Sequence, residues 1–180
     1  MAAGDGLISM KPTSITHAGT SASINADGGV DFTSATDLSL NGVFASGFDN
    51  YLMVIRWSST SAGNVAVKLR ASGTDATGSN YTRQYLTADS TTVSGARQTS
   101  QTYATHGFTS TGESGVHIYV YGSYLAQPTA LRSVCIGSYL GAYLQDDACT
   151  HSLSTSYDGI TIYPASNSIT GALTIYGLSQ

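Results

Sequence analysis

Hydrophobic and polar residues alternate with a period of two along most of this chain. One face of the segment 50–58 carries only large apolar side chains, namely Tyr51, Met53, Ile55 and Trp57. Successive side chains of a β-strand point to opposite faces, so this pattern predicts a strand with one buried side. Four further segments are also expected to be strands: 65–70, 81–88, 116–121 and 131–140.

Two short apolar segments near the C-terminus flank a turn-forming sequence. Residues 160–163 and 173–176 combine isoleucine with threonine and tyrosine, and residues 164–168 between them are Pro-Ala-Ser-Asn-Ser. Proline, asparagine and serine favour chain reversals because they preset or tolerate the backbone angles of a turn. We therefore expect an antiparallel hairpin at this end of the chain.

The same pattern argues against helices. No eleven-residue window places apolar residues at helical spacing after a capping residue, and glycine, serine and threonine are abundant. Short strands separated by turn signals are typical of sandwiches and barrels. We expect an all-β protein, an antiparallel β-sandwich. About eight strands fit between Leu38 and Leu178, a number that suits a jelly roll.

The first 34 residues differ from the rest. They are rich in Gly, Ala, Ser and Thr and have no sustained alternation. We interpret residues 1–34 as an extended N-terminal arm for assembly, which could add a strand to the sheet edge of a neighbouring subunit. Residues 35–180 then form the sandwich domain.

Composition limits the possible partners. Only 10% of the 180 residues are charged, and seven Lys and Arg residues oppose eleven acids. No basic stripe is available to neutralise several phosphates, so we expect no nucleic-acid binding. The longest apolar run, 51–55, is far shorter than the roughly 20 residues that span a bilayer, so we expect no membrane insertion. The first residues lack a secretory signal, which predicts synthesis in a cytoplasm.

Enzymatic chemistry has little support in the residue pattern. No serine stands in a Gly-x-Ser-x-Gly elbow, and Glu113 is the only glutamate available to form a carboxylate pair. The histidines occur without a zinc-binding spacing; they are His17, His106, His117 and His151. We predict that the protein is not an enzyme and needs no cofactor.

One local cluster contains potential metal ligands. Asp146, Asp147, Cys149 and His151 lie within six residues, in a segment that we place in a loop or at a strand end. An acidic turn between two strands is the favoured interpretation, and a metal site the weaker one. With Cys135, the chain has two cysteines, and the sequence does not decide whether they pair. Free, buried thiols are favoured.

Tyrosine is the most unusual feature of the composition, with 12 residues. Five of them lie in or near neighbouring predicted strands, mostly opposite the aliphatic face: Tyr119, Tyr121, Tyr124, Tyr139 and Tyr143. Tyrosine combines a large apolar ring with a polar tip, so it is common at subunit interfaces and on sugar-binding surfaces. An interface or ligand surface is one interpretation of this set, and core packing is the other.

Several turn and strand segments resemble small structural proteins of tailed bacteriophages, of the tail-fibre, minor tail or head-decoration type. The strongest matches are Leu-Asn-Gly-Val-Phe at 40–44, Phe-Asp-Asn-Tyr at 48–51, Leu-Arg-Ala-Ser-Gly-Thr-Asp at 69–75, and Ile-Tyr-Gly-Leu at 175–178. The resemblance implies a β-sandwich module, commonly trimeric, on the virion surface. It brings no catalytic residue with it.

These observations favour a virion structural protein. We expect a homotrimeric fibre or decoration subunit that contacts other virion proteins, stabilises the particle and takes part in host attachment. The alternative is a carbohydrate-binding module at a tail-fibre tip that recognises a host surface glycan.

Overall fold

The alternating segments form β-strands in a computed structural model that describes residues 6–138 and 142–179. This part of the chain contains sixteen strands and no helix. The strands form two sheets, and all their pairings are antiparallel. The predicted all-β class is confirmed, and the two antiparallel sheets agree with a β-sandwich.

The larger sheet has ten strands. They are β1 (Leu7–Ser9), β3 (Ser21–Ile24), β4 (Val30–Ala35), β6 (Asn50–Ser59), β9 (Tyr81–Asp89), β10 (Thr92–Gln101), β12 (Ser114–Tyr121), β13 (Thr129–Gly137), β14 (Tyr143–His151) and β16 (Ile169–Leu178). Their order is β10-β9-β14-β13-β12-β6-β16-β4-β3, and β1 pairs with β16. The strands β10 and β3 are therefore its two edges.

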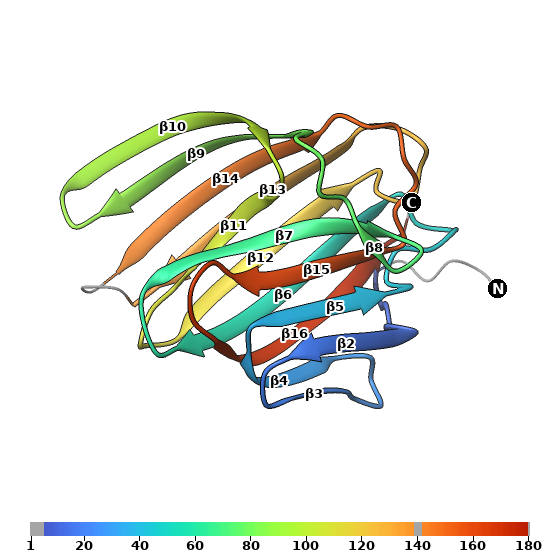
Figure 1. Cartoon of the computed structure of the whole chain (residues 1–180), viewed down its shortest axis with the longest axis horizontal. Helices are drawn as coiled ribbons and strands as arrows, with labels where there is room; N and C mark the ends of the chain where they lie inside the picture. The colour runs from blue at the N-terminus through green and yellow to red at the C-terminus, as the bar shows by residue number, and fades with distance from the viewer. Residues whose placement is uncertain (1–5, 139–141, 180) are drawn as a thin grey trace.

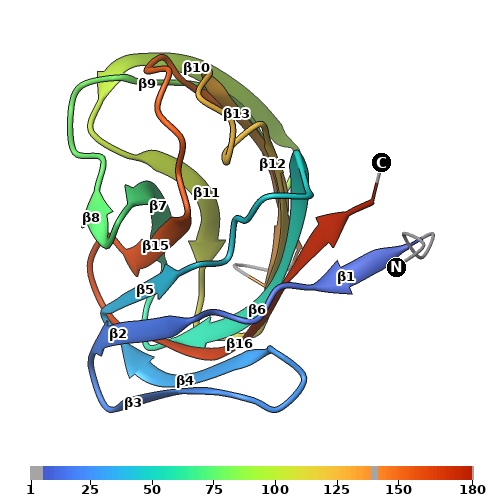
Figure 2. The ribbon, with the colours of Figure 1, turned by 90° about the vertical axis from the view of Figure 1, so that its right-hand side faces the viewer.

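The smaller sheet has six strands and lies across one face of the larger sheet (Figures 1 and 2). They are β2 (Ser14–Ala18), β5 (Asp37–Asn41), β7 (Gly63–Ala71), β8 (Thr74–Asp75), β11 (Ala104–Thr109) and β15 (Gly159–Pro164). The order is β11-β7-β15-β5-β2, with β8 on β7. In Figure 1, β9 and β10 extend beyond this smaller sheet.

The core lies between the two sheets and follows the period of two. Tyr51, Met53 and Trp57 on β6 are buried, and so are Leu69 on β7 and Ile160 on β15. The residues between them point to the outer face of each sheet. One hydrophobic cluster joins both sheets, and the apolar alternation correctly predicted which side of β6 is buried.

The two C-terminal segments are strands, but the predicted hairpin is wrong. Residues 159–164 form β15, which pairs with β5 and β7 in the smaller sheet. Residues 169–178 form β16, which pairs with β4 and β6 in the larger sheet. The turn between them crosses from one sheet to the other, because both strands carry an apolar face that packs into the same core.

The structure does not confirm an N-terminal arm that stands apart from the domain. Within the described residues, β2 pairs with β5 in the smaller sheet, and β4 pairs with β16 in the larger one. Val30 and Phe32 are buried in the core. The expected boundary between residues 34 and 35 falls inside β4. These strands were not predicted because their short, serine-rich sequences show little alternation.

The strand number was also underestimated. Twelve strands, β5 to β16, lie between residues 37 and 178, where about eight were expected. The additional ones include β14, in a segment assigned to a loop or a strand end, and β10. All residues of β10 except the last are exposed, so an edge strand without a buried face shows no apolar alternation.

Candidate interaction surface

The acidic cluster of the sequence lies in the middle of β14 and not in a turn. Asp146 points to the outer face of the larger sheet, where its carboxylate accepts a hydrogen bond of 2.9 Å from Arg132. Asp147 points into the sandwich, where Arg83 donates to its Oδ1 over 2.6 Å. His151 is also buried, and its Nδ1 lies 3.2 Å from the hydroxyl of Tyr157. The predicted ligands therefore already have other partners.

Asp147 is the centre of a buried polar network that the sequence did not indicate. Gln145 donates to its second carboxylate oxygen over 2.6 Å, and the Tyr143 hydroxyl donates to the side-chain Oε1 of Gln145 over 2.9 Å. Arg83 also donates to Gln98 on the edge strand β10. Burial raises the pKa of Asp147, while the Arg83 charge acts in the opposite direction. The network joins β9, β10 and β14.

A serine and a histidine meet next to this network. The Nδ1 atom of His106 on β11 lies 2.9 Å from the Oγ of Ser133 on β13. Both residues are completely buried, so no substrate can reach the hydroxyl in this conformation. Burial lowers the pKa of His106 to about 3, and the ring is neutral at ordinary pH. The pair connects the two sheets as a structural contact.

The two cysteines are free thiols on neighbouring strands. Cys135 lies on β13 and Cys149 on β14, and both are buried. Burial raises the pKa of Cys135 to about 11 and that of Cys149 to about 12. Neither thiol is therefore activated as a nucleophile at neutral pH.

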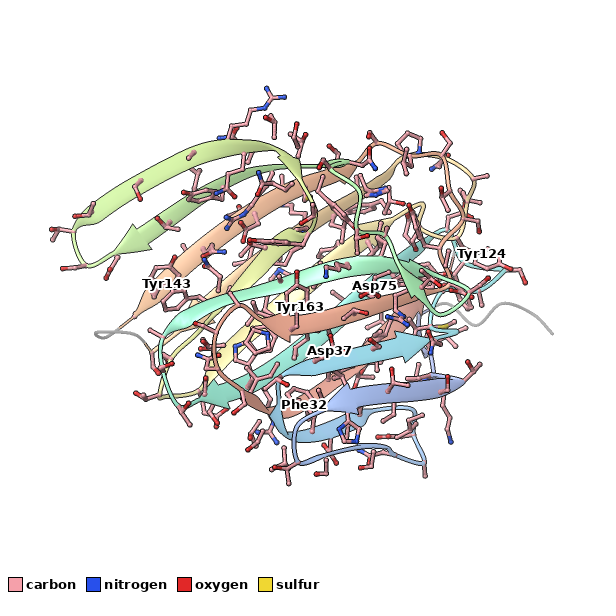
Figure 3. The ribbon with its side chains drawn as sticks, viewed as in Figure 1. Phe32, Asp37, Asp75, Tyr124, Tyr143 and Tyr163 are labelled. Atoms are coloured by element: carbon pink, nitrogen blue, oxygen red, sulfur yellow. The ribbon has the colours of Figure 1, made fainter. Side chains whose placement is uncertain are left out.

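The five tyrosines do not form one surface. Tyr119 and Tyr121 lie on the outer face of β12, with parallel rings whose centroids are 6.1 Å apart. Tyr143 points inward and packs its ring against Phe108 at 4.7 Å. Tyr124 lies in the segment that follows β12, and Figure 3 shows it at the opposite end of the molecule from Tyr143. The fifth, Tyr139, lies outside the described residues.

The outer face of the larger sheet carries an apolar patch. Strand register places Val93, Ala88, Leu144 and Ile136 side by side across β10, β9, β14 and β13. Leu86 lies in the adjacent row, which continues through Asp146, Val134 and His117 to Val54 on β6. We define the outer patch as Val54, Leu86, Val93, Ile136 and Leu144. Its most exposed side chains are Val93 at 74%, Ile136 at 61% and Leu86 at 58%.

A groove lies beside this patch on the same face. Its floor is formed by the small side chains of Ala130 and Ala148, and Tyr121 on β12 and Arg97 on β10 rise at its two sides. The groove has a volume of about 430 Å³. The remaining lining residues include Thr82, Gln84, Arg132 and Thr150. We call this cavity the outer groove.

The outer face of the smaller sheet is different, because its polar groups bind one another. Arg70 donates to Ser39 over 3.0 Å and to Thr161 over 2.7 Å, and it forms an ion pair with Asp75. Lys68 lies over the ring of Tyr163, 4.6 Å from its centroid; Figure 3 shows Asp75 and Tyr163 on this side. These groups are already satisfied, so this face offers less to a partner than the outer patch.

The described residues contain neither a metal-binding cluster nor a membrane-spanning helix. No group of three or more His, Cys, Asp and Glu side chains there is arranged to hold a metal ion. No helix long and apolar enough to cross a membrane occurs in the same part of the chain. Comparison with known protein families and with curated proteins found no match for this sequence.

Proposed function

We propose that this chain is a structural subunit that assembles with copies of itself on the surface of a bacteriophage particle. The observation that carries the proposal is the outer patch on the ten-stranded sheet. Five large apolar side chains are exposed there, and three of them, Val93, Leu144 and Ile136, share one row with Ala88 across four neighbouring strands. Contiguous apolar surface of this kind is typical of sites where proteins associate.

The chemistry around the patch also favours a lasting protein contact. Tyr119 and Tyr121 lie further along the same face, and tyrosine is enriched in interfaces. Charged residues make up only 10% of the chain, and charged groups are depleted from the centres of interfaces. Burying the patch against a second subunit would remove its apolar side chains from water, and Asp146, which lies next to Leu86 in the register, is already paired with Arg132.

The phage setting rests on the resemblance of the turn and strand segments to small virion proteins. That resemblance favours a homotrimer with jelly-roll connectivity at the virion surface. Such a subunit would stabilise the particle, contact other virion proteins and take part in host attachment. The two-sheet architecture supports this proposal because viral capsid domains include folds of two packed β-sheets.

Purified particles of a phage that encodes this chain provide the test. Mass spectrometry of particles banded in a density gradient is expected to detect the chain at many copies per particle. Gold-labelled antibodies raised against the purified protein are expected to decorate intact virions and to distinguish head from tail. Banded particles that lack the chain would contradict a virion role.

The outer groove favours a second candidate function, recognition of a host glycan. An aromatic ring, two hydroxyl side chains and an amide line this shallow cavity. Sugars are bound by such combinations, because a ring packs against their C–H faces and polar groups meet their hydroxyls. The groove lies beside the outer patch, so one subunit could assemble through the patch and bind a sugar in the groove.

A further inference from the structure

The charges of the outer groove indicate which class of glycan it would take. We propose that it binds an acidic oligosaccharide, with one sugar ring over Tyr121 and carboxylate groups toward Arg97 and Arg132. This inference rests on the second candidate function and adds the charge of the ligand. It does not depend on the assembly proposal, because none of the five outer-patch residues lines the groove.

The fold creates the groove from differences in side-chain size across four strands. Register places Tyr121 on β12 next to Ala130 on β13, followed by Thr150 on β14 and Thr82 on β9. Small side chains thus follow a large ring along one cross-strand row. Neighbouring strands are about 4.8 Å apart, so this row offers a floor roughly 10 Å wide, enough for a sugar ring.

The adjacent row brings two guanidinium groups to the same floor. Arg97 pairs with Gln84, Gln84 with Ala148, and Ala148 with Arg132. The two arginines are therefore three strands apart, about 14 Å between their backbones. Only Gln84 and the methyl group of Ala148 separate them along this row. Both arginines line the groove.

The electrostatic balance of the groove is opposite to that of the chain. The protein has a formal net charge of −4, yet no Asp or Glu is among the residues that line this cavity. Arg132 shares its charge with the exposed carboxylate of Asp146. Arg97 forms no salt bridge with any described residue. It is therefore available to a carboxylate of the ligand, for which a guanidinium provides a bidentate donor.

The other groups that line the groove favour an acidic sugar over anionic ligands of other classes. The hydroxyls of Thr82 and Thr150 and the amide of Gln84 provide both donors and acceptors, as sugar hydroxyls require. The exposed ring of Tyr121 offers a flat apolar surface. A nucleic acid would need several cations along its backbone, and the groove has two.

Calorimetry with matched acidic and neutral oligosaccharides tests the proposal. The acidic probes are trimannuronate and sialyllactose, and their neutral counterparts are β-1,4-mannotriose and lactose. We expect at least one acidic probe to bind the full-length protein and its neutral counterpart to bind at least tenfold more weakly. The heat of binding should decrease at high salt, since ions screen an exposed contact between charges.

Three variants and a control locate the site. R97Q and R132Q should each reduce the affinity for the acidic probe about tenfold or more, in line with the loss of one hydrogen bond between charged groups. Y121A should reduce the affinity for acidic and neutral probes by the same factor. R56Q is the control, because Arg56 is exposed on the same sheet face but does not line the groove.

The possible failures can be told apart. Equal affinity for acidic and neutral probes, unchanged in R97Q, would overturn the acidic assignment and leave glycan recognition standing. Binding that R56Q reduces as much as R97Q would also overturn the site. If no probe binds, both the inference and the second candidate function are wrong, while assembly through the outer patch is unaffected.

Discussion

Two adjacent aspartates on β14 show how strongly burial changes the contribution of an ion pair to stability. Asp147 is completely buried, and Arg83 and Gln145 satisfy its carboxylate. Asp146 is paired with Arg132 at the surface, where the two side chains are 39% and 61% exposed. Losing one partner of a buried pair leaves the other charge without compensation, whereas water replaces the partner at the surface.

The variant D147N should therefore unfold far more easily than D146N. We expect D147N to lower the free energy of unfolding by about 3–5 kcal/mol. For D146N we expect a loss below about 1 kcal/mol. Urea denaturation followed by circular dichroism measures both variants. Equal losses would show that the buried network of Asp147 contributes no more than an exposed contact.

His106 should make stability depend on pH. Its pKa is lowered to about 3 in the folded protein by burial, whereas an unfolded histidine titrates near 6.5. Below pH 6.5 the unfolded chain binds a proton that the folded chain does not. The stabilising effect of the neutral ring is therefore complete above pH 6.5 and is lost progressively between pH 6.5 and 3.

The variant H106Q measures this contribution. Between pH 6 and pH 4, the wild type should lose about 1.4 kcal/mol per pH unit more than H106Q does. Urea midpoints over this pH range provide the comparison, and the difference in slope is independent of any constant destabilisation by the substitution. Parallel pH profiles for the two proteins would contradict a buried, neutral His106.

At the scale of elements, the strands of the larger sheet need glycine at one position and only tolerate it at another. A Cβ atom at Gly171 on β16 would lie 2.0 Å from the carbonyl oxygen of Arg56. Gly115 on β12 pairs with Arg56 from the other side of β6. A Cβ atom at Gly115 would be 4.0 Å from its nearest neighbour, the carbonyl oxygen of Ile55. The backbone of β6 therefore approaches β16 too closely for any side chain.

This contrast predicts opposite effects of the same substitution. G171A should reduce the free energy of unfolding by about 1–3 kcal/mol, because the sheet must shift to admit the methyl group. G115A should leave stability unchanged or raise it by up to about 1 kcal/mol, since glycine weakens a strand. Thermal unfolding compares the two variants. A larger loss for G115A would contradict the register of β12, β6 and β16.

The sequence predicted strands where one face is buried and the other exposed. β6, β7, β9 and β12 fit this description and were found at the expected places. β14 was missed because its inward face is largely polar, with Gln145 and Asp147 buried there. β10 was missed because it is exposed on both sides. The partner of each strand was not predictable. The apolar segments of β15 and β16 have nearly the same sequence, Ile-Thr-Ile-Tyr and Leu-Thr-Ile-Tyr, but the two strands belong to different sheets.

At the scale of the whole molecule, the candidate surfaces depend on strand order. The alternation of β12 correctly placed Tyr119 and Tyr121 opposite the core. The outer patch and the outer groove combine residues that are far apart in the chain, such as Val54 with Leu144 in the patch and Thr82 with Thr150 in the groove. No sequence motif marks these sets, because they form only when β9, β10, β13 and β14 become neighbours.

Assembly through the outer patch is the central claim, and two threonine substitutions test it. Ile136 and Leu144 are exposed neighbours on β13 and β14. Threonine preserves the preference for strand and removes much of the apolar surface. The variant I136T/L144T should therefore remain folded and lose its partner. L153T is the matched control, because Leu153 is exposed in a loop away from the patch.

The most direct measurement is the solution mass of these proteins by light scattering at micromolar concentration. The wild type and L153T are expected to have the mass of a trimer, and I136T/L144T the mass of a monomer with an unchanged circular dichroism spectrum. A monomeric wild type, or a double variant that stays trimeric, would contradict assembly through the outer patch.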